Sequence, residues 1–215
     1  MIVDKNKLLD TIIAVRPGLA KKEFVEQATH LLFLGDTLAT YNDQICIIAP
    51  FETDFKCSVS GDEFYKILAS IKEDQVEIVV DEKQLVVKSK KTKAGMSTIV
   101  GENAKVESLV EKIKQEVSAK RFWKHLPDNF VEGVNLCTFS ASRDMTQKDR
   151  CCVAVRDDKV VSTDGIRLSR FLLDAPVKDE MLIPIREALE LVKYPVVEYG
   201  KSQGWLHFRT EEGVV

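Results

Sequence analysis

The chain has 215 residues, of which 31 are basic and 34 acidic, and its formal net charge is −3. Hydrophobic residues make up 45% and charged residues 30%, a composition that excludes a disordered chain, a coiled coil and collagen. The near-neutral balance excludes a polybasic tail but allows DNA binding through one locally basic face. No apolar run approaches the length of about 18 residues that spans a membrane, and the N-terminus lacks the pattern of a signal peptide. We therefore expect a cytoplasmic protein of one or two domains.

The first half of the chain predicts two units of one helix and three strands. In the first, a short strand over 1–3 precedes a helix that Asp4 caps and that ends near Pro17; strands are expected over 29–35, 37–42 and 45–51. In the second, a strand over 55–59 leads to Ser60 and Glu63, which have the spacing of a capping box. Apolar residues at helical spacing follow, and strands are expected over 75–80, 84–89 and 94–100.

The second half repeats this order. A helix beginning at Pro127 is followed by strands over 150–155, 159–163 and 167–173. A strand over 181–184 then leads into a helix whose first turn contains Pro184, followed by strands over 195–200 and 204–210. One more strand is expected near Val214.

The repeat of about 45 to 50 residues indicates how the chain is organised. Short hairpin links favour antiparallel sheets with segregated helices, an α+β fold. Paired units predict a first domain over 1–105 and a second over 126–215 that lacks its last strand. The charged segment 106–125 is expected to be a connector whose helical part lies on the surface.

Two segments resemble a known family. Thr163-Asp164-Gly165-Ile166-Arg167-Leu168 is similar to the T-D-G-h-R-L segment of the bacterial DNA sliding clamp, the beta subunit of DNA polymerase III. The segment 181–193, MLIPIREALELVK, is similar to that family's strand-to-helix segment, and 29–51 and 55–100 match its first domain in element order. The bacterial members have three domains, so the chain resembles an N-terminal two-domain portion or a shortened relative.

The resemblance implies a replication processivity factor with the DNA-clamp fold. Such a protein encircles duplex DNA without reading its sequence, tethers the polymerase, and has no catalytic residues, metal or cofactor. Polymerase and clamp loader would bind through a short hydrophobic peptide. The complete protein would form a homo-oligomeric ring, a dimer or, for two-domain subunits, a trimer; a fragment could be monomeric.

The resemblance also implies a DNA-facing set of basic side chains. In the family the helices line the inner wall of the ring, and the loops that follow them approach DNA. The alternative is a set of ordinary solvated lysines, and the helix near Asp128 and Glu132, which contains no base, argues against a uniformly basic wall. The candidates are Lys5, Lys7, Lys21, Lys22, Lys66, Lys72, Arg143 and Lys148.

A groove for the partner's peptide is the second implied site. Gly165 would permit a turn and close peptide approach, Leu168 and Val153 would form the apolar wall, and the stem of Arg167 could cover an anchor. Ile166 stands where the family commonly has histidine. The alternative is a plain turn between two strands. The residues of the predicted groove are Val153, Thr163, Gly165, Ile166, Arg167 and Leu168.

Other functions have weaker support in the sequence. A clamp-like binding module or decoy would capture the same peptides without encircling DNA. An enzyme would need convergent polar residues, and the chain has none of the common nucleotide-binding, metalloprotease or hydrolase motifs. Asp157 and Asp158 could suggest a metal but fit a solvated turn. The five cysteines fit no zinc pattern and are expected to be buried, reduced thiols, with adjacent Cys151 and Cys152 on opposite faces of a strand.

Overall fold

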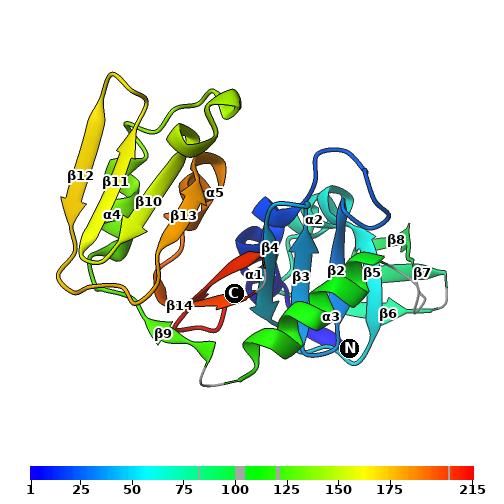
Figure 1. Ribbon diagram of the computed structural model, residues 1–215. Coiled ribbons are helices and arrows are strands. Elements are labelled where there is room, and N and C mark those ends of the chain that lie inside the picture. The colour runs from blue at the N-terminus through cyan, green and yellow to red at the C-terminus, as the bar shows by residue number, and fades with distance from the viewer. Residues whose placement is uncertain (82, 100–104, 120–121, 203) are drawn as a thin grey trace. The chain divides into compact units, whose positions relative to one another are not determined.

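The computed structural model describes residues 1–81, 83–99, 105–119, 122–202 and 204–215 (Figure 1). The chain divides into two compact units. Unit 1 comprises Met1–Gln115 and Glu212–Val215, and unit 2 comprises Glu116–Glu211. No helix within the described ranges is long and apolar enough to cross a bilayer.

Unit 1 contains two four-stranded antiparallel sheets with the strand orders β1-β6-β7-β8 and β4-β3-β2-β5. Its elements are β1 (Ile2–Asp4), α1 (Lys5–Val15), the 3-10 helix η1 (Arg16–Gly18), β2 (His30–Leu34), β3 (Thr37–Tyr41), β4 (Cys46–Pro50), β5 (Lys56–Ser60), α2 (Gly61–Ser70), β6 (Gln75–Val80), β7 (Gln84–Lys88), β8 (Lys93–Ser97) and most of α3 (Lys105–Val117).

The helices of unit 1 begin where the sequence predicts. Asp4 caps α1 by accepting a hydrogen bond from the Lys7 backbone N–H at 2.9 Å. Ser60 occupies the N-cap of α2, but its side chain makes no cap hydrogen bond, so the expected capping box is not formed. Phe64 on α2 is fully buried and contacts Phe33 on β2 edge to face, with ring centroids 5.7 Å apart. This contact fixes α2 against the sheet.

The helical part of the segment expected to be a connector packs against a sheet of unit 1 by one of its faces. Val106, Val110 and Ile113 on α3 are buried, and the helix runs across the strands of the β4-β3-β2-β5 sheet (Figure 1). Residues at i, i+4 and i+7 share one face of a helix, so this apolar stripe is what the sheet covers. The charged side chains from Glu107 to Glu116 lie outside this stripe and are half-buried or exposed. Residues 100–104 and 120–121, where the domain end and part of the connector were expected, lie outside the described residues.

Unit 2 repeats the arrangement with a four-stranded sheet, β12-β11-β10-β13, and a three-stranded sheet, β15-β14-β9. Its elements are β9 (Lys124–His125), α4 (Phe130–Cys137), the 3-10 helix η3 (Met145–Cys151), β10 (Cys152–Arg156), β11 (Lys159–Thr163), β12 (Leu168–Leu172), β13 (Met181–Pro184), α5 (Ile185–Leu191), β14 (Val196–Ser202) and β15 (Trp205–Thr210).

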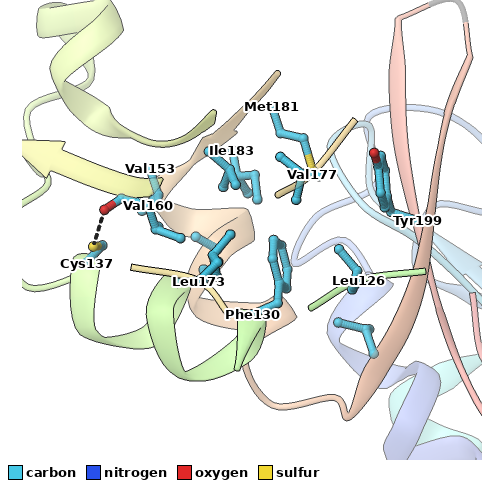
Figure 2. Packing of buried hydrophobic residues seen from close by; sticks show 14 residues of the cluster. Leu126, Phe130, Cys137, Val153, Val160, Leu173, Val177, Met181, Ile183 and Tyr199 are labelled. Atoms are coloured by element: carbon cyan, nitrogen blue, oxygen red, sulfur yellow. Dashed lines mark hydrogen bonds between the residues drawn. The ribbon is translucent and has the colours of Figure 1, made fainter. Parts of the chain in front are cut away.

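The core of unit 2 lies between its helices and sheets (Figure 2). Phe130 on α4 is 1% exposed, and the thiol of Cys137 donates to the carbonyl oxygen of Val160 at 3.3 Å. A Cβ on Gly133 would lie 2.7 Å from the ring of Phe171, so the glycine lets α4 approach the sheet closely. Leu136 on the same helix is half exposed.

The α+β fold and its helix-plus-three-strand repeat are confirmed. The strand expected near Val214 does not form a named element of unit 2. Instead Val215, which belongs to unit 1, exchanges two backbone hydrogen bonds with Ile48 on β4, at 2.8 and 2.9 Å.

Candidate functional site

The turn between β11 and β12 is held rigidly by one carboxylate. Asp164 Oδ1 accepts from the backbone N–H groups of Ile166 at 2.9 Å and Arg167 at 2.7 Å. Its Oδ2 accepts from Nε and Nη2 of Arg167 at 2.8 and 2.7 Å. These two backbone donors, and then the guanidinium, hold the pKa of Asp164 well below its ordinary value. The shape of the turn is thus set by hydrogen bonds within the turn itself.

Thr163 and Gly165 complete this turn. Thr163 Oγ1 accepts from the Gly165 backbone N–H at 3.0 Å and donates to the carbonyl oxygen of Arg167 at 2.6 Å. Gly165 has φ +90°, a left-handed conformation that a side chain would strain. The glycine therefore has the local role that the sequence predicts.

Two residues that the sequence analysis missed lie against the turn. The guanidinium of Arg167 stacks over the ring of Phe139 at 4.9 Å, and the Phe139 side chain is 69% exposed. A Cβ on Gly165 would meet Nη1 of Arg150 at 2.7 Å. Phe139 could have been noticed as an aromatic residue just beyond a predicted helix. No local signal marks Arg150, which precedes a strand and reaches the turn only in the folded unit.

The apolar residues of the predicted groove differ in their exposure to solvent. Ile166 at the tip of the turn is 95% exposed and Leu168 at the start of β12 is 69% exposed, so both offer apolar surface to a partner. Val153 does not, because its side chain is fully buried in the core of unit 2. The expectation that Val153 forms a groove wall is therefore wrong. On a half-buried strand alternate side chains face opposite sides, and Val153 faces inward.

The basic candidates lie on both units. In unit 1 Lys7 and Lys66 are exposed on α1 and α2, Lys21 and Lys22 are exposed between η1 and β2, and Lys72 is exposed just after α2. In unit 2 Arg143 and Lys148 are exposed in the segment between α4 and β10. These residues are accessible to phosphates, as the prediction requires.

Lys5 is the exception. Its side chain is buried, and Nζ donates to the carbonyl oxygen of Ile71 at 2.9 Å. A lysine whose ammonium group is desolvated and bonded to the backbone cannot reach a DNA phosphate without breaking that hydrogen bond. The prediction for Lys5 is wrong, and the residue instead ties α1 to the segment after α2.

Side chains that could bind a metal are dispersed in the part of the chain that the structure describes. Among the described residues, no three histidine, cysteine, aspartate or glutamate side chains cluster as metal ligands would. Burial raises the pKa of Cys46 and Cys57 to about 12 and that of Cys137 and Cys152 to about 11. Thiols with such values are protonated at neutral pH and are poor nucleophiles.

Cys151 and Cys152 were expected on opposite faces of one strand, but they do not share a strand. Cys151 ends η3 and Cys152 begins β10. Both thiols approach the carbonyl oxygen of Lys148, at 2.8 and 3.6 Å. The change from 3-10 helix to strand between them removes the alternation on which the expectation depended.

Comparison with solved structures shows what this architecture is similar to. The DNA polymerase III beta chain of Streptococcus pneumoniae TIGR4 matches 99% of this chain with a TM-score of 0.80 and 18% identity. The corresponding beta subunit of Streptococcus pyogenes matches 99% with a TM-score of 0.81 and 16% identity. A sliding clamp of Pseudomonas aeruginosa, solved bound to griselimycin, matches 100% with a TM-score of 0.76 and 15% identity.

The likeness is confined to the fold. This chain spans 62% of the length of each of these three proteins. No family model matches the sequence, and no curated protein matches it. The resemblance to the sliding clamp noted in the motif at 163–168 is thus confirmed at the level of the fold, over nearly the whole chain.

Proposed function

We propose that this chain is part of a DNA sliding clamp, a replication processivity factor that encircles duplex DNA in the cytoplasm and tethers a polymerase. The observation that carries the proposal is the match of 99–100% of the chain to bacterial clamps at TM-scores of 0.76 to 0.81. A clamp needs no reacting groups. It needs a closed ring of repeated units, accessible cations for phosphates and a surface for a partner's peptide.

The mechanism follows from tethering. A polymerase that leaves the primer end stays near it while bound to a ring on the same DNA, so recapture takes place at high effective concentration. Phosphate contacts in such a ring must be weak and independent of sequence, which suits lysines on exposed helices and loops. The preorganised turn at Asp164, with exposed Ile166 and Leu168 beside it, is the proposed docking point for the polymerase and the clamp loader.

The topological claim is tested by retention on circular DNA. The full-length protein is loaded by its cognate loader onto nicked circles, washed in high salt and assayed before and after the circle is cut. Retention that disappears on linearisation is expected, because a ring slides off a free end. Retention that ignores the cut, or no retention with an active loader, would instead favour a peptide-binding relative that does not encircle DNA.

The phosphate contacts are tested by charge reversal. Lys21→Glu with Lys22→Glu should weaken DNA association and flatten the plot of log K against log salt concentration by about 0.9 for each phosphate that is no longer neutralised. Reversal of Lys90 and Lys91, an adjacent exposed pair between β7 and β8, is the matched control and should leave the slope unchanged. Titrations of a DNA duplex at several salt concentrations measure both. Equal slopes for the two variants would show that Lys21 and Lys22 are only solvated.

A further inference from the structure

The two units contain equivalent four-stranded sheets whose outer faces differ. In unit 1 the sheet order is β4-β3-β2-β5 and in unit 2 it is β12-β11-β10-β13. In each, three consecutive hairpin strands follow a helix, and the fourth strand leads into the next helix. The repeat allows the two outer faces to be compared position by position.

The outer face of the unit 1 sheet is covered. Thr40 Oγ1 donates to a carbonyl oxygen of α1, so Thr40 faces that helix and its neighbour Ala39 faces away. Ala39 pairs with Leu32 and Ile48 on the adjacent strands, which places all three on the outer face. All three are nearly inaccessible.

The cover on this face is α3. Its apolar stripe of Val106, Val110 and Ile113 is buried. Ion pairs join its flanks to the strands and turns of the sheet: Lys114 Nζ lies 2.6 Å from Asp36, and Glu111 lies 3.8 Å from Lys56 Nζ. The chain itself therefore shows what seals this kind of face, namely an amphipathic helix with charged flanks.

The corresponding face of unit 2 is open. Val160 and Phe171 lie against Gly133 of α4, so the alternate residues of β11 and β12 face away from the helix. In Figure 1 α4 lies behind this sheet. On the outer face Leu172 is 56% and Leu182 51% exposed, with Val161 half-buried between them. Exposed apolar side chains on an uncovered sheet face are surface of the kind that partner proteins bind.

The charged residues of this face indicate which kind of partner it would bind. The four strands contain three basic residues and no acidic residue. Each base alternates with an inward residue, so all three project outward. Glu180 pairs with Arg156 and Asp158 pairs with Lys159 from positions just outside the strands, so an acidic partner has to compete with these two carboxylates. The outward bases are Arg156, Lys159 and Arg170.

We propose that the outer face of the β12-β11-β10-β13 sheet binds an acidic amphipathic helix of a partner protein. Apolar side chains at i, i+4 and i+7 would cover Leu172, Val161 and Leu182, and flanking carboxylates would meet the outward bases. The seat of α3 in unit 1 is the structural precedent. The inference is separate from DNA encirclement. By the same alternation Leu168 lies at the end of this face, next to the turn at Asp164, so the face adjoins the proposed peptide site.

Two peptides that differ only in flank charge test the proposal. Both are variants of the sequence of residues 105–117, KVESLVEKIKQEV. The acidic probe has its three lysines replaced by glutamate, and the basic probe has its three glutamates replaced by lysine. Fluorescence anisotropy with the full chain at low salt should show the acidic probe binding at least about tenfold more tightly, since cations and carboxylates attract in the complex.

Substitutions on this face test whether the acidic probe binds there. Leu172→Asp and Leu182→Asp should each reduce affinity for the acidic probe at least about tenfold, whereas Phe24→Asp, at an equally exposed position of unit 1, should not. Arg170 is exposed, so Arg170→Glu should leave the fold intact. This variant should reduce or reverse the difference in affinity between the acidic and the basic probe. Circular dichroism checks that each variant is folded.

The other possible occupants are separate outcomes. The proposal would be overturned if the acidic probe failed to bind. It would also be overturned if the affinity for this probe were unchanged in all three variants, Leu172→Asp, Leu182→Asp and Arg170→Glu. So would co-sedimentation with phosphatidylserine vesicles that Leu182→Asp abolishes, which would assign the face to a lipid surface. Concentration-dependent dimerisation that the same substitution abolishes would assign it to a second copy of the chain and overturn the proposal equally.

Discussion

Replacement of Phe130 by alanine is expected to lower the free energy of unfolding of unit 2 by about 3 to 5 kcal/mol. The ring is 1% exposed and packs in the core of the unit (Figure 2), with its centroid 5.9 Å from that of Phe208 on β15. Phe130 thus joins α4 to the second sheet of the unit. Its truncation leaves a cavity that the surrounding rigid elements can fill only in part.

Tryptophan fluorescence during urea unfolding measures this effect. The chain has two tryptophans, Trp123 and Trp205, and both lie in unit 2. Phe139→Ala is the matched control, because the same side chain just beyond α4 is exposed and its stacking with Arg167 contributes about 1 kcal/mol or less. Similar decreases in stability for the two variants would contradict the core assignment of Phe130.

Replacement of Leu168 by aspartate is expected to abolish binding of a short hydrophobic peptide. Leu168 is the most exposed apolar residue of β12, and it adjoins the turn that Asp164 holds rigid. A central apolar contact in an interface contributes about 2 kcal/mol or more, which corresponds to a decrease of about 30-fold or more in affinity. Because the side chain is exposed, the fold should be retained.

Isothermal titration of a peptide with leucine and phenylalanine anchors measures that decrease. Ile13→Asp, an exposed apolar position on α1 of unit 1, is the control and should bind like the unmodified chain. Ile166→Asp, at the tip of the turn, should also weaken binding. An affinity unchanged by both Leu168→Asp and Ile166→Asp would remove the groove assignment while leaving the fold and the retention experiment untouched.

The repeat and the fold class could be predicted from the sequence because they depend on local features. Apolar spacing distinguishes helix from strand within a few residues, and Asp4, Pro184 and the turn residues mark boundaries through their own backbone chemistry. The motif at Thr163–Leu168 was noticed through its resemblance to the clamp family. The hydrogen bonds of Asp164 that shape it join residues two and three positions apart, so they too are local.

Tertiary structure decided which of these side chains are accessible. Lys5 and Lys7 lie two positions apart on one helix, yet only Lys5 contacts the backbone at Ile71 and is buried. Val153 was expected to line a groove because of the family resemblance, and the sequence does not say which face of a strand receives a helix. The same uncertainty applied to α3, because the spacing of its apolar residues does not say which sheet buries them.

The sequence by itself therefore determined the order and type of the elements and the shape of the turn at Asp164. The packing of distant segments determined that Phe139 and Arg150 flank this turn, and that α3 covers one outer sheet face while Leu172 and Leu182 remain exposed on the other. The physical reason is range: hydrogen bonds and periodicity act over a few residues, whereas burial depends on contacts between elements far apart in the chain.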